Sequence, residues 1–184
     1  MNTSQAAIDL IKTREDFAPK AYADGEISGV KQHSIGYGHQ IQPGESNLLT
    51  MTISRDTAEA LLRSDVAPLE TQLNRDLRVK PSQNQFDALV DFGYNCGPGA
   101  LAKVIGTWNA IKDGNLKPVT DEISAYNKTH VNGQLVVSST LTKRRSQEVS
   151  LFNSSLPPGL ASGAVTIGGV LVAGVVTYIL LSKA

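Results

Sequence analysis

Apolar residues recur at helical spacing along most of the first 153 residues. Ile8, Leu10 and Ile11 follow Ser4, a candidate N-cap, and predict a first helix over residues 4–14. Runs of similar period predict further helices, at residues 54–73, 81–96, 101–104, 107–113 and 118–127, and a basic helix after residue 138. This pattern is typical of a mainly α-helical domain.

Residues 21–44 interrupt the helical pattern, because they are rich in glycine and carry turn signals at Asp24-Gly25 and Ser28-Gly29. Residues 34–37 fit the returning strand of a hairpin. The order of helix, hairpin and many helices predicts an α+β fold with a small β-hairpin lobe. We expect Pro68 to kink or divide the long helix around it, and residues 128–138 to form a polar loop.

The pattern changes again at the C-terminus, where no charged residue occurs between Glu148 and Lys183. The 18 residues 164–181 are uncharged and mostly apolar, and as a helix they would span roughly 27 Å. Because the run is apolar on all sides and contains three glycines, we expect a transmembrane helix over residues 164–182 rather than a buried core helix. Residues 154–163 then form a linker after a domain of residues 1–153.

Charge and cysteine content narrow the possible partners. The 17 basic and 17 acidic residues balance, which disfavours nucleic acid as a partner. Cys96, the single cysteine, cannot form an internal disulfide, and the three histidines lack metal-ligand spacing. No metal or cofactor is expected. The N-terminus lacks the basic and apolar regions of a signal peptide.

Candidate chemistry lies where the first helix passes into the hairpin. Glu15 precedes Asp24 by nine positions, and the hydroxyl of Ser34 follows. Two carboxylates held apart are what cleavage of a glycosidic bond requires. Phe17 and Tyr22 can desolvate Glu15 and favour its protonated form, whereas Asp24 in a polar turn can stay ionised. The spacing alone is weak evidence, because solvated surface carboxylates show it as well.

The segments around these carboxylates, residues 11–15, 21–24 and 34–39, resemble the phage-type lysozymes of glycoside hydrolase family 24. In that family a Glu ends the first helix, an Asp follows after eight residues, and the Thr of a T-I-G-x-G-H motif comes later. Residues 85–95 resemble the family's Q-F-D-A-L-V-x-F-x-x-N segment. Residues 141–148 resemble its closing G-L-x-x-R-R-x-x-E helix, with Thr140 in place of the Gly.

The resemblance implies a lysozyme-like fold and hydrolysis of the β-1,4 bond between N-acetylmuramic acid and N-acetylglucosamine in bacterial peptidoglycan. It implies Glu15 as general acid and Asp24 as the base that positions or activates water, with inversion at the sugar carbon. Ser34 stands where the family has Thr and can hold the water or Asp24. Nine residues separate Asp24 from Ser34, where five are usual, so Glu26 in the same turn is an alternative second carboxylate.

Three further residues are candidates for binding substrate: Tyr37, His39 and Asn95. Each also has a structural interpretation, as a packed ring for Tyr37, an ion pair with Asp65 for His39, and a helix cap for Asn95. The basic pair of the last helix, Arg144 and Arg145, can likewise contact peptidoglycan carboxylates or form a buried ion pair.

The predicted anchor bears on where the enzyme is located, because a C-terminal membrane segment leaves the catalytic domain in the cytoplasm, away from peptidoglycan. One answer is the host inner membrane, opened late in infection by a holin or another lesion. The other, which we favour, is a virion that contains a lipid membrane, with other virion proteins as partners and a role in cell entry. The rival functions are a lytic transglycosylase that uses Glu15 alone and a non-catalytic wall-binding virion protein.

Overall fold

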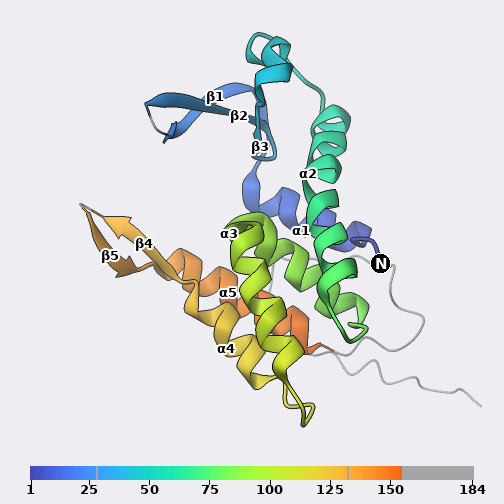
Figure 1. The fold of residues 1–184 in the computed structure, drawn as a ribbon. Helices are drawn as coiled ribbons and strands as arrows, with labels where there is room; N and C mark the ends of the chain where they lie inside the picture. Colours follow the sequence, from blue (N-terminus) through green and yellow to red (C-terminus); the bar gives the residue numbers. More distant parts are fainter. Residues whose placement is uncertain (28, 132, 155–184) are drawn as a thin grey trace, which may run out of the picture.

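The computed structural model describes residues 1–27, 29–131 and 133–154 (Figure 1). Its α-helices in this part of the chain are α1 (Gln5–Glu15), α2 (Arg55–Asp76), α3 (Gln83–Ala110), α4 (Lys117–Ala125) and α5 (Ser139–Asn153). A 3-10 helix, η1 (Pro43–Leu49), precedes α2. The chain is therefore mainly helical, as its periodicity predicts.

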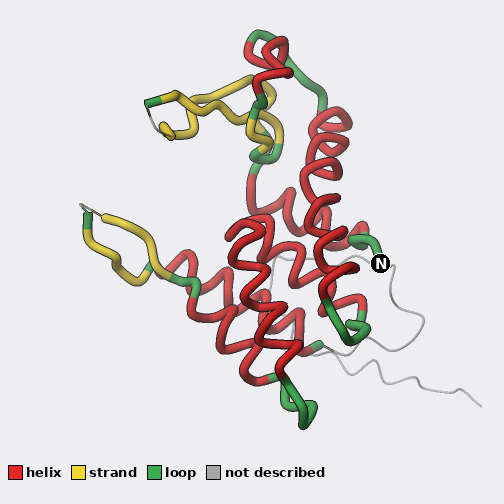
Figure 2. The backbone as a smooth tube through the Cα atoms, in the orientation of Figure 1, coloured by secondary structure: helices red, strands yellow, loops and turns green. Residues whose placement is uncertain are grey.

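Two small sheets complete the fold (Figure 2). Strands β1 (Ala18–Ile27), β2 (Val30–Gly36) and β3 (His39–Gln40) form an antiparallel sheet directly after α1. Strands β4 (Lys128–Val131) and β5 (Gln134–Val137) form a separate hairpin between α4 and α5. In Figure 1 both hairpins extend from the helices on the same side of the view. The predicted α+β architecture with a β-hairpin lobe is confirmed.

Serine N-caps begin four of the described helices. This explains why the local sequence predicts where several of these helices begin. In α1 the hydroxyl of Ser4 accepts a hydrogen bond from the backbone N–H of Ala7, which satisfies a group that the helix itself leaves unpaired. The same arrangement recurs at the starts of α2, α3 and α5, with Ser54, Ser82 and Ser138 as caps.

The core lies between the helices, with α3 against α1, α2, α4 and α5. Phe86, Leu89 and Phe92 of α3 are fully buried, and Trp108 packs edge-on against Phe152 of α5 with ring centroids 5.1 Å apart. Burial of side chains of this size stabilises the domain by roughly 1.5–3 kcal/mol each. The core therefore fixes α1 and α5 against α3.

Three expectations about local structure are wrong. Pro68 does not divide α2, because the residue lies on the exposed side of the helix, where water can reach the carbonyl that loses its hydrogen bond. The predicted stop at residues 97–99 is confirmed by non-helical angles at Gly97 (φ 83°, ψ 166°), but the chain beyond this break forms one helix to Ala110 instead of the two short helices expected. Where a polar loop was expected over residues 128–138, residues 128–131 and 134–137 form the paired strands β4 and β5, since β-branched residues flank an Asn-Gly sequence.

The membrane prediction falls outside this description. Residues 164–182, and the linker apart from Ser154, are not among the described residues. Within the described part of the chain, no helix combines the length and apolar character needed to cross a membrane.

Candidate active site

Glu15 is the last residue of α1, and its carboxylate is paired with an arginine from the far end of the chain. Arg144 of α5 donates from Nη1 to Glu15 Oε1 at 2.6 Å. The same guanidinium donates from Nη2 to Asp91 Oδ1 at 3.1 Å, and Arg14 also donates to Asp91, which is fully buried in α3. Arg144 therefore ties the carboxylate of Glu15 to the helical core.

This pairing leaves the second oxygen of Glu15 available. A Cβ atom placed on Gly38 would lie 4.0 Å from Glu15 Oε2 and 3.6 Å from the hydroxyl of Tyr94. Gly38 has a φ of 90°, a conformation that glycine adopts without steric cost. The absence of a side chain at Gly38 keeps open the space beside the oxygen that Arg144 does not hold.

Asp24 and Ser34 face each other across β1 and β2. Ser34 Oγ donates to Asp24 Oδ2 at 2.6 Å, and Ser34 is fully buried whereas Asp24 is exposed. The ladder pairs Tyr22 with Ser34 and Ala23 with His33, and then shifts register before Glu26. Asp24 lies at this bulge. The nine residues between Asp24 and Ser34 are accommodated by the longer strands and the bulge, so Asp24 still contacts Ser34.

Glu26, the alternative second carboxylate, lies further along β1. It is exposed and pairs in register with Lys31. Of the two acids, Asp24 is the one that accepts the hydrogen bond from Ser34. The geometry therefore favours Asp24 for a role that depends on that hydroxyl.

Tyr22 connects the two carboxylates electrostatically. Burial raises the pKa of Tyr22, and the negative charges of Asp24 and Glu15 raise it further, although a hydrogen bond with Ser34 acts in the opposite direction. The sequence suggested Tyr22 only as an apolar neighbour of Glu15; the strand register, which the sequence did not indicate, places it opposite Ser34.

Tyr94 of α3 is a second residue of this region that the sequence did not single out. Its hydroxyl donates to the backbone carbonyl of Tyr37 at 2.8 Å and so joins α3 to the loop after β2. Burial, followed by the charges of Asp65 and Glu15, raises the pKa of Tyr94. Tyr94 therefore remains a neutral hydrogen-bond donor beside Glu15.

The three candidate substrate-binding residues all have partners within the protein. Tyr37 is buried, with its ring 5.6 Å from that of Phe17. His39 is buried between Asp65 and Glu45, at 2.9 Å from each, so the predicted ion pair with Asp65 is confirmed. Asn95 is exposed and accepts from Arg145 Nη2 at 2.8 Å. Of the three, Asn95 alone has an exposed side chain.

Arg145 and Glu148 form a buried ion pair behind the site. Arg145 is 1% exposed and donates to Glu148 Oε1 at 2.6 Å, and its guanidinium lies 5.1 Å from the ring centroid of Phe92. Burial and the charge of Asp91 raise the pKa of Glu148, whereas the neighbouring guanidiniums act in the opposite direction. The structural interpretation of the basic pair thus holds for Arg145.

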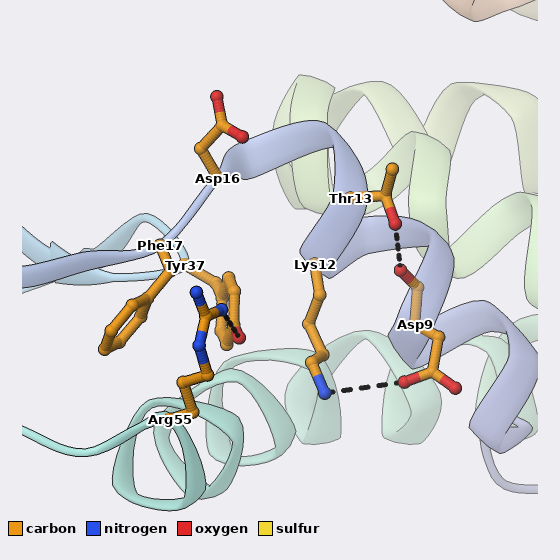
Figure 3. A pocket seen from close by; sticks show the side chains of 7 residues that line it. All are labelled: Asp9, Lys12, Thr13, Asp16, Phe17, Tyr37 and Arg55. Atoms are coloured by element: carbon orange, nitrogen blue, oxygen red, sulfur yellow. Dashed lines mark hydrogen bonds and ion pairs between the residues drawn. The ribbon is translucent and has the colours of Figure 1, made fainter. Parts of the chain in front are cut away.

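A pocket of about 600 Å³ lies on a different face of α1 from Glu15. Figure 3 shows Phe17, Tyr37 and Arg55 grouped together, with Lys12 of α1 to one side of them and Asp16 pointing away. The guanidinium of Arg55 lies 4.6 Å from the ring centroid of Phe17. The pocket is lined by Asp9, Lys12, Thr13, Asp16, Phe17, Tyr37 and Arg55, and so includes neither Glu15 nor Asp24.

Residues 1–27, 29–131 and 133–154 contain no group of three or more His, Cys, Asp and Glu side chains arranged to hold a metal ion. The candidate site itself presents carboxylates, hydroxyls and guanidiniums. The site thus holds two carboxylates in different surroundings, one paired with an arginine and one with a serine, and glycoside hydrolysis uses a pair of carboxylates.

The helical core, the β-hairpin lobe and these carboxylates define a lysozyme-like α+β domain. The chain belongs to the phage lysozyme family, which it matches over residues 12–148. It is 37% identical over 163 residues to an endolysin of Bacillus phage PZA, covering 89% of this chain and 59% of that relative. The chain thus spans little more than half the length of that curated relative.

Solved structures show the same fold. The endolysin of Escherichia coli O157:H7 phage FAHEc1 has a TM-score of 0.70 and 32% identity, covering 86% of this chain and 97% of the other. The muramidase domain of SpmX from Asticaccaulis excentricus also has a TM-score of 0.70, at 30% identity, covering 84% of this chain and 99% of the other. The suspected resemblance to phage-type lysozymes is confirmed.

Proposed function

We propose that the protein is a phage-encoded muramidase that hydrolyses the β-1,4 bond between N-acetylmuramic acid and N-acetylglucosamine in peptidoglycan. The observation that carries the proposal is the pair of supported carboxylates, Glu15 held by Arg144 and Asp24 held by Ser34, in a chain of the phage lysozyme family. Each carboxylate has a fixed partner, which a positioned acid and base require.

In the proposed reaction Glu15 donates a proton to the glycosidic oxygen as the bond from that oxygen to the sugar carbon breaks. Water attacks the same carbon from the opposite face, and Asp24 accepts its proton, so the configuration inverts. Arg144 fixes one oxygen of Glu15, and Oε2 is the oxygen free to carry the proton. Ser34 fixes the direction of the Asp24 carboxylate.

Release of reducing ends from purified peptidoglycan by the full chain tests this function. We expect wild type to release reducing muramic acid and Glu15→Gln to release none while unfolding at a similar temperature. Glu26→Gln, which changes an exposed acid of the same hairpin, is the matched control and should stay active. Substantial cleavage by Glu15→Gln would refute the assignment of the acid.

The products separate the hydrolase from its rivals. Hydrolysis gives a reducing muramic acid end, and NMR of the first-formed anomer reports inversion. A lytic transglycosylase instead gives a 1,6-anhydro end, which mass spectrometry detects. A non-catalytic wall-binding protein would bind peptidoglycan and release neither product.

We also propose that residues 164–182 anchor the protein in a membrane, that of a lipid-containing virion or the host inner membrane. The support is the uncharged apolar sequence of this segment. The full chain should sediment with membranes and resist extraction by carbonate, whereas a chain ending at residue 155 should not. Detection in purified particles would support a role in entry, and its absence from them would favour host lysis.

A further inference from the structure

The β4–β5 hairpin exposes apolar side chains that the rest of the described chain leaves uncovered. Leu135 and Val137 are 57% and 63% exposed, and Val131 and Val136 are 50% and 37% exposed. Figure 1 shows the hairpin extending away from α4 and α5. A two-stranded hairpin is only marginally stable alone, and clustered exposed apolar groups mark interaction sites. The hairpin is therefore a candidate interaction surface.

One face of this hairpin combines positive charge with apolar groups. The register places Lys128 opposite Val137 and His130 opposite Leu135. Because alternate pairs in a ladder share a face, these four side chains lie on the same side of the hairpin. Among the described residues, neither Lys128 nor His130 forms an ion pair with an acid. This face, the Lys128–Leu135 face, suits a ligand with carboxylates beside short aliphatic groups.

The hairpin leads directly into α5, the helix whose Arg144 holds Glu15. Its base is closed by a hydrogen bond of 2.9 Å from the backbone N–H of Ser138 to the carbonyl of Asn127. Arg144, which holds Glu15, follows Ser138 by six residues, or about 9 Å of helix. The β1–β2 hairpin with Asp24 extends on the same side of the view in Figure 1. One extended polymer can thus engage both hairpins.

We propose that the Lys128–Leu135 face binds the peptide stems of peptidoglycan next to the bond that is cleaved; this rests on the proposed function. Stem peptides carry free carboxylates and alanine methyl groups, which match the ammonium of Lys128 and the aliphatic side chains of Leu135 and Val137 on this face. A bilayer is a poorer match, because immersion would place the unpaired edges of both strands and the polar Gln134 in hydrocarbon.

Kinetics on two substrates test the proposal: intact peptidoglycan, and the same glycan strands after an amidase has removed the stems. For the double variant Leu135→Ser/Val137→Ser, and for Lys128→Gln, we expect KM on intact peptidoglycan to rise about fivefold, with kcat unchanged. On stripped glycan both constants should equal those of wild type. Val79→Ser and Lys112→Gln change exposed residues in other loops and serve as controls.

An equal rise of KM on both substrates, or no rise on either, would overturn the role of the hairpin. If wild type cleaves neither substrate, the proposed function fails, and an NMR titration of the full chain with a synthetic stem tetrapeptide still decides the binding site. Shifts confined to the hairpin amides, and lost in Lys128→Gln, would support it. No shifts with the peptide, or binding only to anionic phospholipid vesicles, would refute it.

Discussion

The guanidinium of Arg144 lies 2.6 Å from the carboxylate of Glu15, although the two residues are 129 positions apart along the chain. Arg144 also bonds Asp91, a buried acid that Arg14 contacts from the opposite side. Glu15 thus belongs to an ionic network that runs from α1 through α3 to α5. In this network Arg144 is the link between the proposed general acid and the core.

We expect Arg144→Gln to lower kcat by about 10- to 100-fold, because a carboxylate that is no longer fixed loses the orientation its proton transfer needs. KM should change little. Stability should fall by about 2 kcal/mol, since Asp91 loses one of its charged donors. Steady-state kinetics and urea unfolding measure these effects. Arg63→Gln, which breaks an exposed pair with Glu59, should leave kcat unchanged, and an unaffected kcat in Arg144→Gln would exclude a positioning role.

The contact between Ser34 and Asp24 makes a second prediction about activity. Ser34→Ala removes the donor to Asp24 Oδ2 and should lower kcat by about tenfold or more. Ser34→Thr retains the hydroxyl and should stay within a few-fold of wild type; a Ser34→Ala variant as active as Ser34→Thr would exclude a role for the hydroxyl.

The two acids of the hairpin can be compared directly by the same kinetic measurement. Asp24→Asn should cost much more activity than Glu26→Gln, because the hydrogen bond from Ser34 goes to Asp24 and Glu26 is exposed opposite Lys31. The reverse order of the two variants would transfer the role of base to Glu26.

Residues close together in sequence made part of the site predictable. Glu15, Asp24 and Ser34 fall within one helix-to-hairpin segment, where turn signals and family spacing both apply. The Ser4 cap and the apolar stripe of α1 likewise depend on neighbours only a few residues away. Local rules of this kind can be read before any tertiary contact is known.

Contacts between distant segments were not predictable in the same way. No periodicity indicates that Arg144 meets Glu15, because that contact depends on how α1 and α5 pack against α3. The bulge that keeps Asp24 beside Ser34 depends on the pairing of two strands. Pro68 was misjudged for a related reason, since its effect depends on which side of α2 faces water.

The environment of His39 lets us predict how the free energy of unfolding changes with pH. Burial acts to lower its pKa, but hydrogen bonds with Glu45 and Asp65 outweigh this and raise the pKa of His39 above its ordinary value. The pKa values of its two partners shift in opposite directions. Burial raises the pKa of Asp65, whereas a backbone hydrogen bond from Gln42, and next a hydrogen bond with His39, lower the pKa of Glu45. Contacts of 2.9 Å on both ring nitrogens favour the charged imidazolium.

A raised folded-state pKa means that the imidazolium contributes its full stability below the unfolded pKa of about 6.5 and loses it as pH rises through the folded value. We expect Asp65→Asn to lower the pKa of His39 and to cost about 1–2 kcal/mol at pH 5, with a smaller loss at pH 9. NMR titration and unfolding at the two pH values measure this. His130, which is exposed, is the internal control, and an unchanged pKa of His39 would rule out the pair with Asp65.

The last prediction concerns Asp16, the residue after Glu15, whose backbone has a conformation that glycine prefers. Its φ is 56° and its ψ is 170°, and its side chain is exposed. Such a conformation costs a non-glycine residue of order 1–3 kcal/mol, whereas a glycine adds less than 1 kcal/mol of unfolded-state entropy. Asp16→Gly should therefore be about 1 kcal/mol more stable than wild type, and Asp16→Ala no more stable. Urea unfolding of the three proteins decides this, and an Asp16→Ala variant as stable as Asp16→Gly would show that Asp16 carries no backbone strain.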